Sequence, residues 1–111
     1  MSEAACAYVV FVTAPDPRTG QDLAKAMVER RLAACVNVVE GLRSFYWWEG
    51  KVQEDREVLL IVKTSSRALP GLKEFTLAAH PYTVPEFVAV PIAEGSEAYL
   101  DWVQAETSPK A

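Results

Sequence analysis

The sequence is poor in the residue types that build metal clusters, disulfide frameworks and nucleotide-binding loops. Its 111 residues include two cysteines, one histidine and five isolated glycines. Two cysteines cannot form the disulfide framework of a small secreted domain, and isolated glycines form no phosphate loop or dinucleotide fingerprint. No cysteine pair has the spacing of a zinc finger. Because no catalytic constellation is legible, we expect a protein that is not an enzyme.

The chain also lacks long apolar segments and an excess of positive charge. Its longest apolar run, Ala4 to Val12, is less than half of the roughly 20 residues that span a bilayer. Met1-Ser2-Glu3 has no basic region, which argues against a secretory signal. A net charge of −4 with scattered basic residues argues against nucleic acid or an anionic membrane as the partner. We expect one soluble, cytoplasmic domain over residues 1–111.

Hydrophobic patterning predicts the order β-α-β-β-α-β, followed by a short helix. Tyr8–Thr13 is apolar on both faces, which is typical of a central strand. The other predicted strands are Ala34–Trp48, Lys51–Thr64 and Pro85–Ala93, and the predicted helices are Thr19–Arg31, Arg67–Ala79 and a segment after Ser96. Leu23, Ala24, Met27 and Val28 form the expected buried stripe of the first helix. This order is that of an α+β, ferredoxin-like sandwich.

Local signals predict where the helices begin and end. We expect Ser65 or Ser66 to cap the second helix and Ser96 to cap the third. Arg30 and Arg31 are expected in the last turn of the first helix, where positive charge suits the helix dipole. The third helix is suited to cover an exposed edge of the sheet.

The two middle strands form a hairpin around the turn Glu49-Gly50, whose glycine tolerates positive φ. If this turn sets the register, paired residue numbers sum to 99, as for Trp48 and Lys51. Gly41 lies inside the first arm and is a candidate β-bulge. Such a bulge would shift the inner register by one residue.

This hairpin is long for the size of its domain. About fourteen residues per arm give roughly 46 Å of strand, whereas a globule of this length is only some 35 Å across. Phe45-Tyr46-Trp47-Trp48 places aromatic side chains on both faces of a ribbon that is marginal alone in water. We therefore expect the tip to leave its subunit and to be buried in a closed homo-oligomer. The alternative is a monomer whose bent hairpin covers the helix-free face of its own sheet.

Short motifs follow one another along nearly the whole chain: Thr13-Ala14-Pro15-Asp16, Leu32-Ala33-Ala34-Cys35-Val36-Asn37, Ser44 with Tyr46-Trp47-Trp48-Glu49-Gly50-Lys51, Lys63-Thr64, His80-Pro81-Tyr82 and Pro85-Glu86. In this order and spacing they resemble the motifs of the CutA family, the divalent-cation tolerance proteins. The resemblance implies a ferredoxin-like subunit in a tight homotrimer, similar in architecture to PII signalling proteins. It also implies a link to tolerance of copper and other divalent metals, with metal binding in some members.

The copper-binding pattern that the resemblance implies is only partly present. Its cysteine before Thr-Ala-Pro-Asp is Val12 here, its histidine before His-Pro-Tyr is Ala79, and only its glutamate, Glu86, matches. His80 and Cys35 are nearby candidates by residue type. We therefore predict weak binding of Cu2+ or another divalent cation by His80, Glu86 and Cys35, and no obligatory cofactor.

Two of these candidates also have a purely structural interpretation. His80 can instead end the second helix through hydrogen bonds to nearby carbonyls. Cys35 lies between Ala34 and Val36, where a cysteine usually behaves as a small buried hydrophobe. Both interpretations stay open on the sequence alone.

A cleft between subunits is the second candidate site. Tyr46, Trp48, Lys51, Lys63 and Glu86 are its expected lining, which suits a small anion or an amphipathic ligand. The alternative is interface packing in which Glu or Asp neutralises each lysine. We predict a non-enzymatic trimer that binds a metal or small ligand. The alternatives are an interaction trimer without ligand and an enzyme that uses Glu86 or Lys63 as a base.

Overall fold

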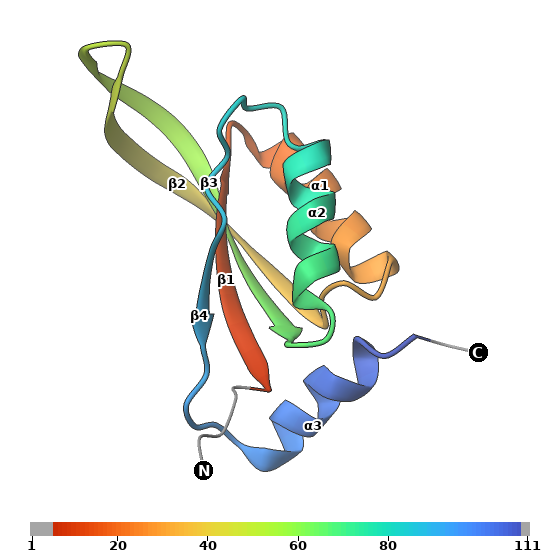
Figure 1. Ribbon diagram of the computed structural model, residues 1–111. Coiled ribbons are helices and arrows are strands. Elements are labelled where there is room, and N and C mark those ends of the chain that lie inside the picture. Colours follow the sequence, from red (N-terminus) through yellow and green to blue (C-terminus); the bar gives the residue numbers. More distant parts are fainter. Residues whose placement is uncertain (1–5, 110–111) are drawn as a thin grey trace.

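The computed structural model describes residues 6–109, and the order of its elements is the predicted one. The strands are β1 (Ala7–Ala14), β2 (Cys35–Trp48), β3 (Lys51–Ser65) and β4 (Val88–Pro91); the helices are α1 (Pro17–Glu29), α2 (Leu69–Ala79) and α3 (Glu97–Glu106). The strands form one antiparallel sheet in the order β2-β3-β1-β4. Helices α1 and α2 lie side by side against one face of this sheet (Figure 1). The predicted α+β fold, with β1 as a central strand, is confirmed.

Two of the predictions concern membranes and targeting. Between residues 6 and 109, no helix combines the length and the apolar composition that a membrane span requires. The segment Met1-Ser2-Glu3, on which the prediction about a secretory signal depends, lies outside the described residues.

Strand alternation gives the sheet one covered face and one open face. Toward α1 and α2 point Val10, Val12, Leu60 and Val62, all with no exposed surface. The opposite face carries Val9, Phe11, Val39, Leu59, Ile61, Val88 and Val90, and we call this set the open face. Neither α1 nor α2 covers it, and three of its valines are 40–48% exposed. One subunit therefore buries only one side of its sheet.

Helix α1 begins two residues earlier than predicted. Asp16 is its N-cap and accepts a hydrogen bond from the Thr19 N–H at 2.8 Å, while Pro17 occupies the first turn. The helix ends at Glu29, and Arg31 takes a positive φ of 62° beyond the C-cap Arg30. The expectation that both arginines lie in the last helical turn was therefore wrong. Arg30 is the C-cap that follows the helix, and the positive φ of Arg31 takes the chain out of the helical conformation.

The other helix boundaries were predicted in part. Helix α2 begins at Leu69 rather than Arg67, and its N-cap is Ala68, which makes no side-chain cap hydrogen bond. The prediction that Ser65 or Ser66 caps this helix was therefore wrong, because the Ser65 hydroxyl accepts the Ala68 N–H at 3.2 Å in a turn that precedes the helix. Ser96 caps α3 as expected, by accepting an N–H of its first turn at 3.4 Å. On α1, Val28 is 41% exposed and does not belong to the buried stripe.

Strand β4 is shorter than the predicted Pro85–Ala93. It has four residues, Val88–Pro91, which pair with Tyr8–Phe11 of β1. Proline donates no ladder hydrogen bond, so Pro85 and Pro91 limit how far the pairing can extend. The residues between α2 and β4, numbered 80–87, are therefore free to form a connecting segment beside the sheet.

The hairpin has the predicted register and the predicted bulge. Outer pairs sum to 99, as in Trp48 with Lys51, and inner pairs sum to 98, as in Val39 with Leu59. The register shifts between Val39 and Leu42, where Gly41 has a φ of +89°. A residue with a side chain would be strained at this φ, so glycine is what permits the bulge.

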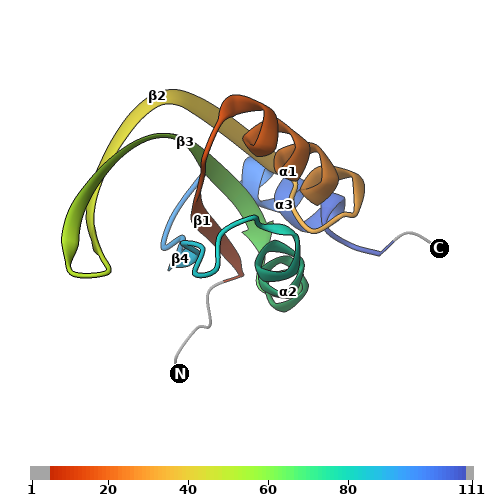
Figure 2. The same ribbon diagram turned by 90° about the horizontal axis from the view of Figure 1, so that it is seen from above.

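The hairpin both bends and leaves the body of the subunit. Figure 1 shows its tip extending beyond the other elements, and Figure 2 shows the two strands arching so that their concave side faces the rest of the chain. The molecule measures 45 × 33 × 23 Å with a radius of gyration of 14.8 Å, against roughly 13 Å expected for a compact domain of this length. The sequence prediction treated bending and protrusion as alternatives, and the structure combines them.

Helix α3 crosses the end of the sheet instead of covering an edge strand. It lies beside the beginning of β1 and the end of β3, the two central strands (Figure 1). Val103 is fully buried there against Ala7 and Ala34. The expectation that this helix covers a sheet edge was therefore wrong.

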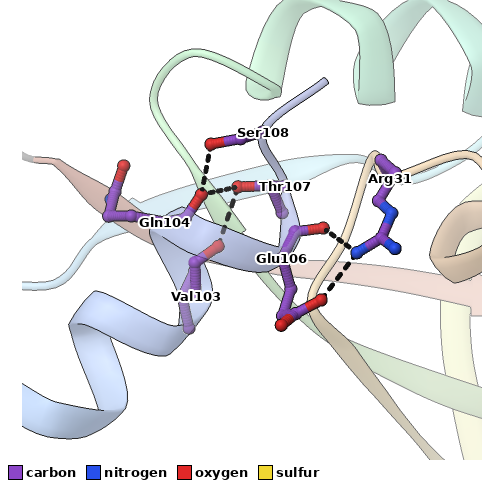
Figure 3. A network of polar contacts seen from close by, with 6 residues as sticks. All are labelled: Arg31, Val103, Gln104, Glu106, Thr107 and Ser108. Atoms are coloured by element: carbon purple, nitrogen blue, oxygen red, sulfur yellow. Dashed lines mark hydrogen bonds and ion pairs between the residues drawn. The ribbon is translucent and has the colours of Figure 1, made fainter. Parts of the chain in front are cut away.

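Polar contacts fasten the C-terminal end of α3 to the base of the molecule. The Arg31 guanidinium donates to the Glu106 carboxylate at 2.6 Å and to its carbonyl at 3.3 Å (Figure 3). The Thr107 hydroxyl donates to the Val103 carbonyl at 2.8 Å and lies 2.7 Å from the Ser65 hydroxyl. This end of the subunit is thus closed by both packing and hydrogen bonds.

Candidate functional site

The concave side of the hairpin forms a pocket with the 80–87 segment. The pocket encloses about 660 Å³. Its walls come from four places in the chain: Thr13 near the end of β1, residues 44–46 and Trp48 of β2, Glu57 of β3, and residues 81–84 with Glu86. Ser44, Tyr46 and Trp48 line it together because alternate residues of a strand point to the same face. The arch of the hairpin then carries that face over the connecting segment (Figure 2).

Glu57 is the buried acid of this pocket. It pairs with Leu42 just beyond the bulge, and only 8% of its surface is exposed. The Tyr82 hydroxyl donates to its Oε2 at 2.7 Å. This bond compensates part of the free energy needed to remove a carboxylate from water. It also fixes the tyrosine ring at the wall of the pocket.

Glu86 places a second carboxyl group in the same pocket. Burial raises the pKa of Glu86, and the negative charge of Glu57 raises it further. Burial, followed by the hydrogen bond to Glu57, also raises the pKa of Tyr82, so its phenol keeps the proton that it donates. The two carboxyl groups therefore act on one another, and together they make the pocket attractive to positive charge.

A third acid borders the pocket from the hairpin. The Tyr46 hydroxyl donates to Asp55, and this hydrogen bond raises the pKa of Tyr46. No Lys, Arg or His lines the pocket, within the part of the chain that the structure describes. The pocket therefore combines acidic groups with aromatic rings and has no cation of its own to balance them.

His80 is held by hydrogen bonds at both ring nitrogens. The Tyr82 N–H donates to its Nδ1 at 3.1 Å, so Nε2 carries the hydrogen and donates to the Thr13 carbonyl at 2.7 Å. The ring is 7% exposed and lies 4.7 Å from the Tyr82 ring. His80 thus ends α2 and positions the 80–87 segment, as the structural interpretation predicted. Ligation of a metal by His80 would require the loss of one of these bonds.

Cys35 and Lys63 lie at another part of the sheet. They face each other in the β2–β3 register, and Lys63 donates to the Asn37 side chain. Tyr99 of α3 is their neighbour, and its pKa is raised by burial and by Cys35. Lys63 is six residues from Glu57 along β3, or about 20 Å at 3.3 Å per residue. One subunit therefore does not bring Cys35 or Lys63 to the carboxyl groups of the pocket.

The structure brings together only part of the predicted site. Tyr46, Trp48 and Glu86 line one pocket, whereas Lys51 pairs with Trp48 at the hairpin tip without lining it. Without the lysines, this pocket of one subunit does not suit a small anion, and the predicted cleft between subunits stays a prediction. No group of three or more His, Cys, Asp or Glu side chains is placed to hold a metal between residues 6 and 109.

Sequence reasoning missed Glu57 and the role of Tyr82. Glu57 directly precedes the apolar stretch Val58–Val62, but it also ends the charged run 54–57, so the sequence does not single it out as a buried acid. Tyr82 belongs to the recognised motif His80-Pro81-Tyr82. Only the arch of the hairpin brings these residues together, and no local pattern in the sequence reports that arch.

Comparison with known proteins agrees with the fold. Residues 8–106 match the family described as CutA1 divalent ion tolerance protein. The divalent-cation tolerance protein CutA of Thermus thermophilus is 58% identical over 99 residues, which are 89% of this chain and 96% of that protein. Protein CutA of Mus musculus is 46% identical over 87% of this chain, which spans only about half of that longer protein, 55% of its length.

Solved structures give the same result. The Thermus thermophilus protein superimposes with a TM-score of 0.89 at 56% identity, over 92% of this chain and 99% of that chain. CutA1 from Oryza sativa superimposes with a TM-score of 0.91 at 46% identity, over 98% of this chain and all of that chain. With its motifs, its fold and these relatives in agreement, the chain belongs to the CutA1 divalent ion tolerance family.

Proposed function

We propose that this chain forms a homotrimer that binds a divalent cation where subunits meet, and that this binding underlies a role in divalent-cation tolerance. The observation that carries the proposal is the pair of carboxyl groups, Glu57 and Glu86, in one pocket without a basic partner. A divalent cation would neutralise both of them. The names of the relatives, which refer to tolerance of divalent cations, support this function and mention no enzymatic activity.

The uncovered surfaces of the subunit support the trimer. Phe45, Trp47 and Val52 at the hairpin tip are 60–74% exposed, and the open face of the sheet adds further apolar surface. Monomeric soluble proteins rarely expose contiguous apolar patches of this kind. Copies of the same chain would cover both surfaces in a closed, symmetric assembly.

The donor set of one subunit is incomplete for a metal ion. Two carboxyl groups, with the hydroxyls of Thr13 and Ser44, supply oxygen ligands of the kind that hard cations prefer. Cu2+ binds most oxygen and nitrogen sites more tightly than other divalent ions do, so copper is included. In the proposed trimer, a neighbouring subunit supplies the remaining ligands and Cys35 stays a predicted contributor, whereas His80 contributes only if it loses one of its two ring hydrogen bonds.

The compartment stays a prediction. Relatives carry names that include a chloroplastic protein from rice and a periplasmic protein from Archaeoglobus fulgidus. These names show that related chains work in several compartments. We propose the cytoplasm for this chain, and fractionation of cells that express the tagged, full-length protein would test it.

Isothermal titration calorimetry with Cu2+, Zn2+ and Mn2+ tests the cation site. The wild-type protein should give saturable heats of binding. Glu86→Gln removes one charged ligand and should weaken the affinity about tenfold, which corresponds to about 1.4 kcal/mol of binding free energy. Glu74→Gln is the matched control, because it makes the same change of charge at an exposed position of α2. Equal and unsaturable heats in all three proteins would overturn the proposal.

A further inference from the structure

We infer that the pocket under the hairpin binds an organic ammonium ion whose body is apolar or aromatic. The inference rests on the proposed function in one respect, since both place positive charge beside Glu57 and Glu86. It goes further because the size and the walls of the pocket specify what surrounds that charge. Three observations carry it: the volume, the aromatic walls and the carboxylate of Glu57, whose Oε1 is reached by solvent from the pocket.

The volume exceeds what a metal ion needs. A cation with six bound waters occupies about 200 Å³, because each water takes up about 30 Å³. The pocket encloses about 660 Å³, which is within the range of roughly 300–1,000 Å³ found for sites of small organic ligands. A metal ion alone would leave most of this space to solvent, whereas an organic cation would fill it.

The walls suit the body and the charge of such a ligand. The rings of Tyr46, Trp48 and Tyr82 line the pocket, so aromatic rings stand on the hairpin side and on the side of the 80–87 segment. Ring faces attract ammonium groups through their quadrupoles, and the attraction strengthens as water is excluded. Trp48 is 45% exposed in the subunit, which leaves ring surface available for contact.

The carboxyl groups of Glu57 and Glu86 fix where the ammonium group binds in the pocket. Glu57 is more than nine-tenths buried, and Tyr82 donates to its Oε2. No buried side-chain N or O atom among residues 6–109 lacks a partner, so Oε1 of Glu57, which Tyr82 leaves unbonded, is reached by solvent from the pocket. An ammonium N–H can donate to this oxygen. Glu86 lies in the same pocket and adds a second negative charge, whereas no lysine or arginine of the described chain lines it. A charged, hydrogen-bonding and partly apolar cation satisfies all of these groups together.

Titration of the intact protein with 2-phenylethylammonium chloride tests the inference. Calorimetry and tryptophan fluorescence should show saturable binding, at least about tenfold tighter than that of the neutral isostere 2-phenylethanol. Glu57→Gln keeps an oxygen acceptor for Tyr82 but removes the charge, and it should weaken binding of the ammonium about tenfold while leaving 2-phenylethanol unchanged. Equal affinity for the charged and the neutral probe would overturn the inference.

Two neighbouring tryptophans offer a matched pair for the aromatic wall. Trp48 lines the pocket, whereas Trp47 points to the opposite face of the hairpin and is 74% exposed. Trp48→Leu should weaken binding of the ammonium about fivefold, and Trp47→Leu should change it less than twofold. Because Trp47 lies on the surface proposed to pack against a neighbouring copy, binding is compared at protein concentrations where sedimentation shows that each variant is fully assembled and circular dichroism shows that it is folded. Equal losses in the two variants would contradict a site inside the pocket.

The same variants separate this inference from the proposed function. Trp48→Leu should leave the calorimetric affinity for Cu2+, Zn2+ and Mn2+ unchanged, because a tryptophan is not a ligand of these ions. Ammonium binding without metal binding would overturn the proposed function and support the inference. Metal binding without ammonium binding would overturn the inference and support the proposed function.

Discussion

The two ends of the molecule use similar apolar side chains but bury them very differently. At the base, Val10, Val12 and Leu60 have no exposed surface, because helices α1 and α2 cover that face of the sheet. At the hairpin tip, Trp47 is 74% exposed and Val52 is 60% exposed. One subunit therefore buries the apolar side chains of its base by itself, whereas the apolar side chains of its hairpin tip need a partner surface to be buried.

The charged groups of the two ends differ in the same way. At the base, Arg31 and Glu106 pair directly at 2.6 Å. In the pocket under the hairpin, Glu57 and Glu86 have no cationic partner in the described chain. The base therefore holds a directly paired arginine and glutamate, whereas the pocket under the hairpin holds two carboxyl groups that a positively charged ligand would neutralise.

The largest effect should come from a cavity at the base. Leu60→Ala removes a fully buried side chain from the centre of the sheet. We expect it to lower the free energy of unfolding by about 2–5 kcal/mol, since both transfer and cavity terms are lost. Urea unfolding followed by circular dichroism measures this loss.

Two valines of β3 sharpen the comparison. Val62→Ala acts at the base, where the side chain is buried, and should lower the free energy of unfolding by about 1.5–3 kcal/mol. Val52→Ala acts at the exposed tip and should leave the far-ultraviolet spectrum unchanged while lowering the fraction of assembled protein on dilution. If the two variants lost the same stability without a change of assembly, the distinction between the ends would be wrong.

Gly20→Ala should have the next largest effect, also at the base. A Cβ added at Gly20 would lie 2.6 Å from Cγ2 of Val58, so the packing between α1 and β3 must shift. Overpacking of this kind destabilises by about 1–3 kcal/mol. Thermal unfolding measures the change, and Gly71→Ala, whose Cβ would lie 3.2 Å from the flexible end of Leu32, is the milder control. Equal losses would show that the close contact does not limit the packing.

The order of the elements and the hairpin register could be predicted from the sequence because they depend on local patterns. Periodicity marked the strands and helices, and Gly41 marked the bulge that shifts the register by one residue. Helix ends were less accurate, since Asp16 began α1 earlier than the apolar stripe suggested. The reach of β4 depends on its pairing with β1, which no local pattern shows.

The site was predictable only where motifs named its residues. Tyr46, Trp48 and Glu86 were expected in a cleft between subunits, which stays a prediction, and within one subunit these three residues line the same pocket. Glu57 was missed, because its role depends on the arch of the hairpin and on the bond from Tyr82. Burial of a carboxylate is a tertiary property, so it follows from the fold and not from the neighbouring sequence.

The smallest effect should come from Glu86→Gln, through pH. The pKa of Glu86 is raised above its ordinary 4.5, so the folded state holds this proton more tightly than the unfolded state does. The protonated Glu86 carboxyl group therefore contributes to folding stability at pH values below its ordinary pKa. This contribution is lost as the pH rises through the pKa that Glu86 has in the folded protein. The variant should therefore match the wild type near pH 4 and exceed its stability at pH 7 by about 0.3 kcal/mol, a small gain because the carboxyl is partly solvated.

Unfolding curves at both pH values check this prediction. Glu74→Gln on the exposed face of α2 is the control, and its difference from the wild type should not vary with pH in this way. A variant that is more stable than the wild type only at acidic pH would contradict the sign of the Glu86 shift.

Sedimentation equilibrium at micromolar concentration tests the central claim most directly, namely that the hairpin and the open face are buried only against identical copies. The account predicts a single species of three times the 12.2 kDa chain, with circular dichroism of a folded α+β protein. A folded, stable species of 12.2 kDa would contradict it, because the tip aromatics would then remain in water with no partner to cover them.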